Sequence, residues 1–187
     1  MTPETTYQIT FGVRRSVRYH NRRRAFFDGW VLVTNAVSVI FGSAAMWVFW
    51  SKVDLDWGVY AALVVTFFSA VNLVVGAGQR ARLHADLARR FFSLEKEIVL
   101  MADPTEEQRR LLMGKRLEIE ADEPPILRVV DVMCHNELAG AMGLERPKDF
   151  YTIPWYLYLT GHFTNWFEGR IIRSDAKLKP TTTESAP

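Results

Sequence analysis

Two stretches of the chain, WVLVTNAVSVIFGSAAMWVFW at residues 30–50 and WGVYAALVVTFFSAVNLVVGAG at residues 57–78, contain no Asp, Glu, Lys or Arg. At a rise of about 1.5 Å per residue, each reaches about 31–33 Å as a helix, which is enough to cross a hydrocarbon core of about 30 Å. The sequence therefore predicts an all-α integral membrane protein with two transmembrane helices joined by an outward-facing turn at 51–56.

Composition limits the other classes. The chain has 187 residues, 49% of them hydrophobic, and a formal charge of only +2, which argues against disorder and against nucleic-acid binding by overall charge. A single cysteine, Cys134, excludes an internal disulfide and a cysteine-rich zinc site. Phosphate-binding glycine loops, HExxH motifs and nucleophile elbows are absent from the sequence. We therefore expect no enzyme activity, no catalytic residues, no metal and no cofactor.

Arginines flank the predicted spans on one side only. The blocks are Arg22, Arg23 and Arg24 before the first span and Arg80 and Arg82 after the second, whereas the turn has one Lys and two Asp. Basic residues are retained in the cytoplasm, so we expect a multi-pass protein with both termini cytoplasmic. The blocks are expected to fix topology and meet lipid phosphate; binding of an anionic effector such as a nucleotide is the alternative. A cleaved signal peptide fits poorly, because its n-region is too long.

Small and polar residues recur at helical spacing on one face of each span: Asn35, Ser38 and Gly42 on the first, and Thr66, Ser69, Asn72 and Gly76 on the second. An antiparallel hairpin centred on the turn brings Asn35 to the depth of Asn72. In lipid such stripes face another helix or water. They either pack the two helices together or, in an oligomer, line a pore; because two helices cannot enclose a channel, a pore needs several copies.

The segment 79–149 is predicted to be a cytoplasmic helical domain that follows the basic N-terminal segment 1–29 and the hairpin. The second span continues unbroken to about Met101, a second helix covers 104–121 with Asp103 as its N-cap, and a third covers 125–142. Apolar stripes support these helices: Leu83, Leu87, Phe91, Leu94, Ile98 and Met101 on the first, Leu111, Leu112 and Ile119 on the second, and Ile126, Val129, Val130, Met133 and Leu138 on the third. We expect them to pack against each other and against copies of the chain.

Residues 150–173 are dense in aromatic side chains and are predicted to form an amphipathic helix. It either docks onto the other cytoplasmic helices or lies in the inner-leaflet interface. We expect Trp30, Trp50, Trp57, Trp155 and Trp166 to act as interfacial anchors. The tail 174–187 is poor in apolar residues and is expected to be disordered.

The cluster Cys134-His135-Asn136-Glu137 is the one group that invites catalytic chemistry. Adjacent residues on a helix point about 100° apart, so Cys134 and His135 do not form a nucleophile–base pair by themselves. We expect Cys134 to be a small buried side chain, and Asn136 and Glu137 to pair with arginines.

Three segments are similar to the SLATT family of bacterial two-span proteins. They are Tyr19-His20-Asn21-Arg22-Arg23-Arg24-Ala25-Phe26-Phe27, then Arg89-Arg90-Phe91 with Leu94-Glu95-Lys96-Glu97-Ile98, and Ile119-Glu120-Ala121-Asp122-Glu123-Pro124-Pro125. The resemblance covers about residues 15–130, and we expect no sensor domain fused to the hairpin. It implies a bacterial inner-membrane effector that oligomerises and perforates the membrane when a separate sensor protein or nucleotide signal reports infection.

These observations lead to one functional hypothesis and one alternative. The chain is expected to be a homo-oligomeric effector that forms pores or perturbs the lipid bilayer in an antiviral conflict system. Alternatively, it is a membrane-anchored interaction protein that tethers a cytosolic partner through its helical extension.

Overall fold

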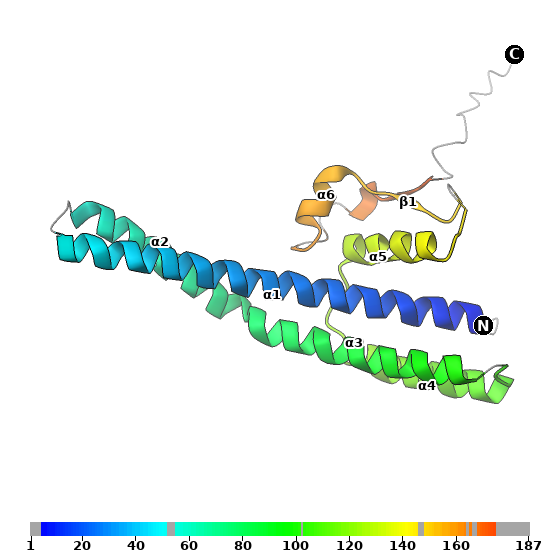
Figure 1. Ribbon diagram of the computed structural model, residues 1–187. Coiled ribbons are helices and arrows are strands. Elements are labelled where there is room, and N and C mark those ends of the chain that lie inside the picture. The colour runs from blue at the N-terminus through cyan, green and yellow to red at the C-terminus, as the bar shows by residue number, and fades with distance from the viewer. Residues whose placement is uncertain are drawn as a thin grey trace, which may run out of the picture. The chain divides into compact units, whose positions relative to one another are not determined.

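The computed structural model of the chain describes residues 5–51, 55–101, 103–145, 148–163, 165 and 168–174 (Figure 1). Helices account for 81% of the described part, so the predicted all-α class is confirmed as a mostly helical fold, to which a short pair of strands is added. The chain divides into two compact units, Asn21–Asp86 and the combination of Met1–His20 with Leu87–Pro187. We call the first the hairpin unit and the second the cytoplasmic-type unit, because it carries the predicted cytoplasmic segments.

The hairpin unit contains the C-terminal part of α1 (Thr6–Ser51), α2 (Leu55–Val75) and the first turns of α3 (Ala77–Leu100). Helix α2 runs antiparallel to α1 (Figure 1). Two helical stretches, Thr6–Ser51 and Asp56–Leu100, are long and apolar enough to cross a membrane, as the uncharged runs predict. Only 6% of the most apolar window of each is buried within the protein. Most of the apolar surface of this unit is therefore exposed in the single chain.

The second span does not continue into the next helix without a break. Helix α2 ends at Val75, and α3 (Ala77–Leu100) begins after Gly76, whose φ of +61° lies in the left-handed region. The backbone N–H of Gly76 still donates to the carbonyl of Asn72 at 3.0 Å. Glycine adopts positive φ without the steric cost that a Cβ adds, so the interruption is located where the sequence can accommodate it.

The core of the cytoplasmic-type unit is built by three helices. Side chains from the N-terminal part of α1, from α3 and from α4 (Glu106–Glu120) form one buried cluster, namely Ile9, Val13, Leu87, Phe91, Leu94, Ile98, Leu112 and Ile119. Helix α5 (Arg128–Ala141) adds a second contact to α1 through Tyr19, Val130 and Cys134. The predicted stripes are thus confirmed except at Leu83, Leu111 and Ile126, which are exposed.

Helix α4 begins two residues later than the sequence reasoning placed it. Its N-cap is Thr105 rather than Asp103: the backbone N–H of Gln108 donates to the Thr105 hydroxyl, and the Gln108 side chain accepts from the Thr105 N–H. This reciprocal capping box satisfies two N–H groups at once, which a lone Asp103 cap does not.

The aromatic segment is not the single amphipathic helix predicted over 150–173. It contains β1 (Tyr151–Thr152), α6 (Trp155–Thr160), the 3-10 turn η1 (Glu168–Arg170) and β2 (Ile172–Arg173). The strands pair antiparallel, with Tyr151 opposite Arg173. Helix α6 stops at Gly161, where an added Cβ would lie 2.5 Å from Val129 Cγ1, so close packing on α5 accounts for the glycine. Trp166 and most of the predicted tail 174–187 lie outside the described residues.

A buried pair of polar side chains joins the elements of the cytoplasmic-type unit. His20 Nε2 on α1 lies 2.9 Å from Glu123 Oε1, and the two side chains are 1% and 7% exposed. The His20 ring stacks on Phe91 with centroids 5.5 Å apart. Next to it, the backbone N–H of Leu127 donates to the Tyr19 hydroxyl at 2.9 Å. Through these contacts, the segment between α4 and α5 packs against α1 and α3.

Replacing Glu123 with Ala is expected to destabilise the fold, because it leaves the His20 imidazole buried without this carboxylate. We expect a loss of about 1–3 kcal/mol in the free energy of unfolding. The matched control is Asp122→Ala, which removes the neighbouring, 59% exposed carboxylate paired with Arg90, with an expected loss of about 0–1 kcal/mol. Unfolding of the full chain in detergent, followed by circular dichroism, measures both; equal losses would contradict the role given to Glu123.

The break after α2 yields a second prediction. Gly76→Ala forces a Cβ into the left-handed region and is expected to cost about 1–2 kcal/mol of unfolding free energy. Gly78→Ala, two residues later inside α3, meets no atom within 4 Å and is expected to stabilise the helix by about 0.5–1 kcal/mol. The melting temperatures of the two variants should therefore shift in opposite directions. A Gly76→Ala variant with a raised melting temperature would contradict the positive φ of Gly76.

Candidate functional site

The base of the hairpin unit contains a cluster around the ring of Phe27. This ring, 3% exposed, stacks on His84 with centroids 5.7 Å apart, and Ala77 and Ala81 complete the buried core. The Arg23 guanidinium carbon lies 4.6 Å from the ring centroid and that of Arg80 lies 5.9 Å from it. Both are cation–π contacts, so the predicted basic blocks meet at one aromatic ring.

The five arginines assigned to topology and lipid phosphate therefore differ in their surroundings. Arg23 is buried, at 7% exposed, and packs on the aromatic rings of its own unit. Arg24 is exposed and its Nε donates to Asp28 at 3.3 Å. Arg80 and Arg82 are exposed, and Arg22 is half-buried. The exposed members are the ones whose surroundings suit contact with headgroups.

The predicted polar stripes are partly exposed and partly half-buried within the single chain. Asn35, Gly42, Thr66 and Ser69 are exposed, whereas Ser38, Asn72 and Gly76 are half-buried. Two of the hydroxyls are satisfied inside their own helices, because Ser38 donates to the Thr34 carbonyl and Thr66 to the Ala62 carbonyl. Such back-bonding is the usual choice for hydroxyls in apolar surroundings.

Thr34 is a buried polar residue of the predicted first span, and sequence reasoning did not single it out. It is 3% exposed, and its hydroxyl donates to the carbonyl of Val31 at 3.0 Å. It lies next to the predicted Asn35, one position before it in the helix. Seven residues before Thr34, Phe27 is also buried, and this two-turn spacing is the signal that identifies the inner face.

Asn72 has a distinct environment. Its Oδ1 atom is buried and accepts no hydrogen bond within the part of the chain that the structure describes. The residue is one turn before the break at Gly76. A buried amide oxygen in apolar surroundings carries a desolvation cost of about 1–3 kcal/mol until a donor reaches it.

Near the far end of the hairpin, close packing follows the predicted antiparallel register. A Cβ at Gly58 on α2 would lie 3.3 Å from Val48 Cγ1 on α1. On α1, Gly42 lines a hollow of about 540 Å³ with Ser43, Met46, Trp47 and Trp50. Of the predicted interfacial anchors, Trp50, Trp57 and Trp155 are 70–83% exposed, whereas Trp30 is half-buried beside Phe27.

The cluster Cys134–Glu137 has a structural role in the cytoplasmic-type unit. Cys134 is fully buried, as predicted, and packs with Tyr19. Asn136 bonds backbone and not an arginine: its amide donates to the Tyr151 carbonyl at 2.7 Å and its oxygen accepts from the Tyr151 N–H at 2.9 Å. His135 Nε2 donates to the Asp149 carbonyl at 2.9 Å. Asn136 and His135 therefore hold the backbone of Asp149 and Tyr151 in place. The N–H and C=O groups of Tyr151 that face away from β2 are strand-edge groups, and the Asn136 amide pairs with them.

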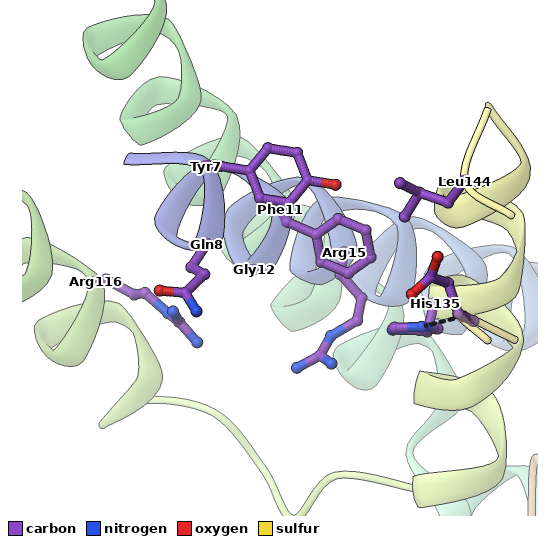
Figure 2. Close-up of a pocket in the computed structure, with 9 residues that line it drawn as sticks. Tyr7, Gln8, Phe11, Gly12, Arg15, Arg116, His135 and Leu144 are labelled. Atoms are coloured by element: carbon purple, nitrogen blue, oxygen red, sulfur yellow. Dashed lines mark hydrogen bonds between the residues drawn. The ribbon is translucent and has the colours of Figure 1, made fainter. Parts of the chain in front are cut away.

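A pocket of about 480 Å³ lies beside this cluster, between α1, α4 and α5 (Figure 2). It is lined by Tyr7, Gln8, Phe11, Gly12, Arg15, Arg116, His135, Leu144 and Asp149. A neighbouring pocket of about 370 Å³ shares Arg15 and His135 with it. Sequence reasoning did not find this site, because its members are distant in the sequence and none belongs to a motif.

Arg15 is held in the wall between the two pockets by an ion pair. Its Nε lies 3.1 Å from Asp131 Oδ1 on α5. Burial raises the pKa of the Asp131 carboxyl above its usual value, and the opposing effect of Arg15 is smaller. Across the described residues, no group of three His, Cys, Asp or Glu side chains is placed to hold a metal ion.

Comparison of the chain with protein-family models, with curated proteins and with solved structures gives no match. The likeness to the SLATT family thus remains a prediction from the quoted motifs. Those motifs come from three distant segments, and His20, Phe91 and Glu123, one from each, form the buried contact described above.

The raised pKa of Asp131 predicts a pH dependence of stability. Because the folded-state pKa is above the unfolded one, the folded state binds the proton more tightly, and unfolding free energy falls as pH rises through the folded pKa. Asp131→Asn lacks this titration. The melting temperature of the full chain minus that of the variant should therefore increase as pH is lowered from 7 toward 4. If this difference in melting temperature decreases over that range, the Arg15 charge lowers the pKa of Asp131 by more than burial raises it.

Proposed function

We propose that the chain is a non-enzymatic membrane effector whose hairpin units assemble into an oligomer that permeabilises the bilayer. The observation that carries the proposal is the hairpin surface. Both apolar windows are only 6% buried, yet the exposed surface includes Asn35, Thr66 and Ser69. In a bilayer the apolar part suits lipid, whereas an exposed amide suits another helix or water.

Association of several copies gives these polar groups a partner. Asn35 is exposed and Asn72 is half-buried, so both side chains can meet a neighbouring copy, although the Asn72 oxygen itself is buried within its own chain. An interhelical hydrogen bond in a membrane contributes about 0.6–2 kcal/mol, so a ring of copies gains from each of them. The hollow at Gly42 and Ser43 supports close approach of a neighbouring helix, because small residues let two backbones come near.

The bacterial setting, and the separate sensor protein or nucleotide signal, come from the resemblance to the SLATT family alone. In that setting the protein resides in the inner membrane with both termini in the cytoplasm. The exposed apolar side chains of α6, namely Trp155, Tyr158 and Leu159, and Phe163 after it support an additional contact with the headgroup region.

The same surface favours the second candidate, a tether for a cytosolic partner. A chain that acts as a tether needs one membrane-bound copy and no opening in the bilayer. The two functions therefore differ in oligomeric state and in membrane conductance, which can be measured together.

The test is inducible expression in bacteria with a membrane-potential dye, combined with the mass of the purified protein in nanodiscs. Wild type is expected to be oligomeric and to depolarise cells. Asn35→Leu with Asn72→Leu should reduce depolarisation at least tenfold at equal membrane abundance, because the polar contacts between copies are lost. The matched control is Leu73→Val, which changes the 83% exposed neighbour of Asn72 and should leave depolarisation intact. A monomeric wild type that leaves the membrane potential unchanged would favour the tether.

A further inference from the structure

The strongest unassigned feature of the cytoplasmic-type unit is the pocket between α1, α4 and α5 (Figure 2). Its volume of about 480 Å³ lies in the range of small-molecule sites, about 300–1,000 Å³. Helix α1 contributes Tyr7, Gln8 and Phe11 to the lining, together with Gly12 and Arg15. The chemical class of a ligand follows from three properties of this lining, namely its rings, its charges and its hydrogen-bond donor.

Aromatic rings form one wall of the pocket. The Tyr7 and Phe11 centroids are 6.2 Å apart, and Phe11 meets His135 edge to face at 5.2 Å. The imidazole is fixed, because His135 Nε2 donates to the Asp149 carbonyl at 2.9 Å. Tyr7 is half-exposed, so its ring is accessible to a ligand that enters from solvent. A flat aromatic molecule can therefore stack on this wall.

The positive charges of the lining are compensated within the chain. Arg15 lies beside Asp131, with 3.1 Å between Nε and Oδ1. Arg116 Nε donates to Glu120 at 2.7 Å, and Arg116 takes part in a further interaction as well. Asp149 also lines the pocket, so three carboxylates accompany the two guanidinium groups. An anionic ligand would approach those carboxylates and a cationic ligand the guanidinium groups, so the lining favours a ligand without a formal charge.

Gly12 determines how Arg116 contributes to the pocket. A Cβ at Gly12 would lie 2.8 Å from Nη1, 3.1 Å from the guanidinium carbon and 3.3 Å from Nη2 of Arg116. Because these three distances are similar, the flat face of the guanidinium lies against the backbone of α1. Arg116 therefore acts as a flat part of the wall, and the site needs no further hydrogen bond from it.

The hydrogen-bond donor of the lining is the side-chain amide of Gln8. The N–H of Thr5 donates to Gln8 Oε1 at 2.9 Å, and the N–H of Gln8 donates to the Thr5 hydroxyl at 3.3 Å, which is a capping box at the start of α1. The amide oxygen is thus engaged, whereas the NH2 group has no acceptor among the residues that the structure describes. Gln8 is exposed, so its NH2 group can donate to a carbonyl oxygen of a ligand.

We infer that this pocket binds an uncharged, flat aromatic molecule with a carbonyl group at its edge, whose ring lies against Tyr7 and Phe11 and whose carbonyl oxygen accepts from the Gln8 amide. The rings provide apolar contact area, the compensated charges select against ions, and the amide sets the orientation of the ligand. Binding of such a ligand requires neither an oligomer nor an opening in the bilayer, so it does not depend on the proposed function.

The test uses the full chain in phosphatidylcholine nanodiscs, titrated by calorimetry at pH 7 with three two-ring probes of similar size, with empty nanodiscs subtracted. The probes are 2-quinolone, which is uncharged and has a carbonyl group, quinoline-2-carboxylate, which is anionic, and N-methylquinolinium, which is cationic. We expect saturable binding of 2-quinolone and about tenfold weaker binding of both charged probes.

Two substitutions test the assigned contacts. Gln8→Glu keeps an oxygen that accepts from Thr5 but removes the NH2 donor, and it should weaken 2-quinolone binding about tenfold. The matched control is Gln108→Glu, because Gln108 makes the same capping box with Thr105 on α4 and is not part of the lining. Tyr7→Leu should also weaken binding about tenfold, and it opens no cavity in the core because Tyr7 is half-exposed.

Three outcomes would overturn the proposal: 2-quinolone shows no saturable binding at millimolar concentration, a charged probe binds as tightly as 2-quinolone, or the Gln8→Glu and Gln108→Glu variants bind 2-quinolone equally well. Circular dichroism melting of each variant keeps the comparison to folded proteins.

Discussion

The contact between His20 and Glu123 takes an imidazole and a carboxylate almost completely out of water, and the rest of the cytoplasmic-type unit is arranged around it. Burying a polar group without a partner costs free energy, and the contact between His20 and Glu123 offsets that cost for both side chains. The pair fixes α1 against the turn between α4 and α5, and Phe91 covers it from α3. Because this turn is fixed, α5 lies beside α1, and these two helices form two walls of the pocket of about 480 Å³.

Much of the fold could be predicted from local patterns. Uncharged runs of more than 20 residues indicate the hairpin, and stripes such as Leu87 and Phe91 indicate the core helices, because both signals lie within one segment. The errors occur where two local signals compete. Asp103 and Thr105 are both good caps, and the choice depends on Gln108, whose side chain completes the capping box. Gly76 lies within an uncharged run, so the sequence has no local signal that the helix is interrupted there.

Long-range contacts account for what sequence reasoning missed at the candidate sites. The aromatic spacing around Trp155 is helical, yet the segment divides because Asn136 bonds the Tyr151 backbone and Gly161 packs closely on Val129. Likewise, no pattern in the sequence connects Arg15 with Arg116. Their proximity depends on α4 folding back along α3, which places residues a hundred positions apart in one wall.

The cytoplasmic-type unit is discontinuous in the chain, and this has a topological consequence. Ile9 and Val13 precede the hairpin, whereas Phe91 and Leu112 follow it, yet all four belong to one core. A bilayer cannot divide a single core, so any path of Asn21–Asp86 through a membrane must have an even number of crossings, whatever the charges at its ends. The same arrangement affects the order of folding during synthesis. Ile9 and Val13 leave the ribosome first, and their apolar face is fully covered only after the hairpin, α3 and α4 have been made.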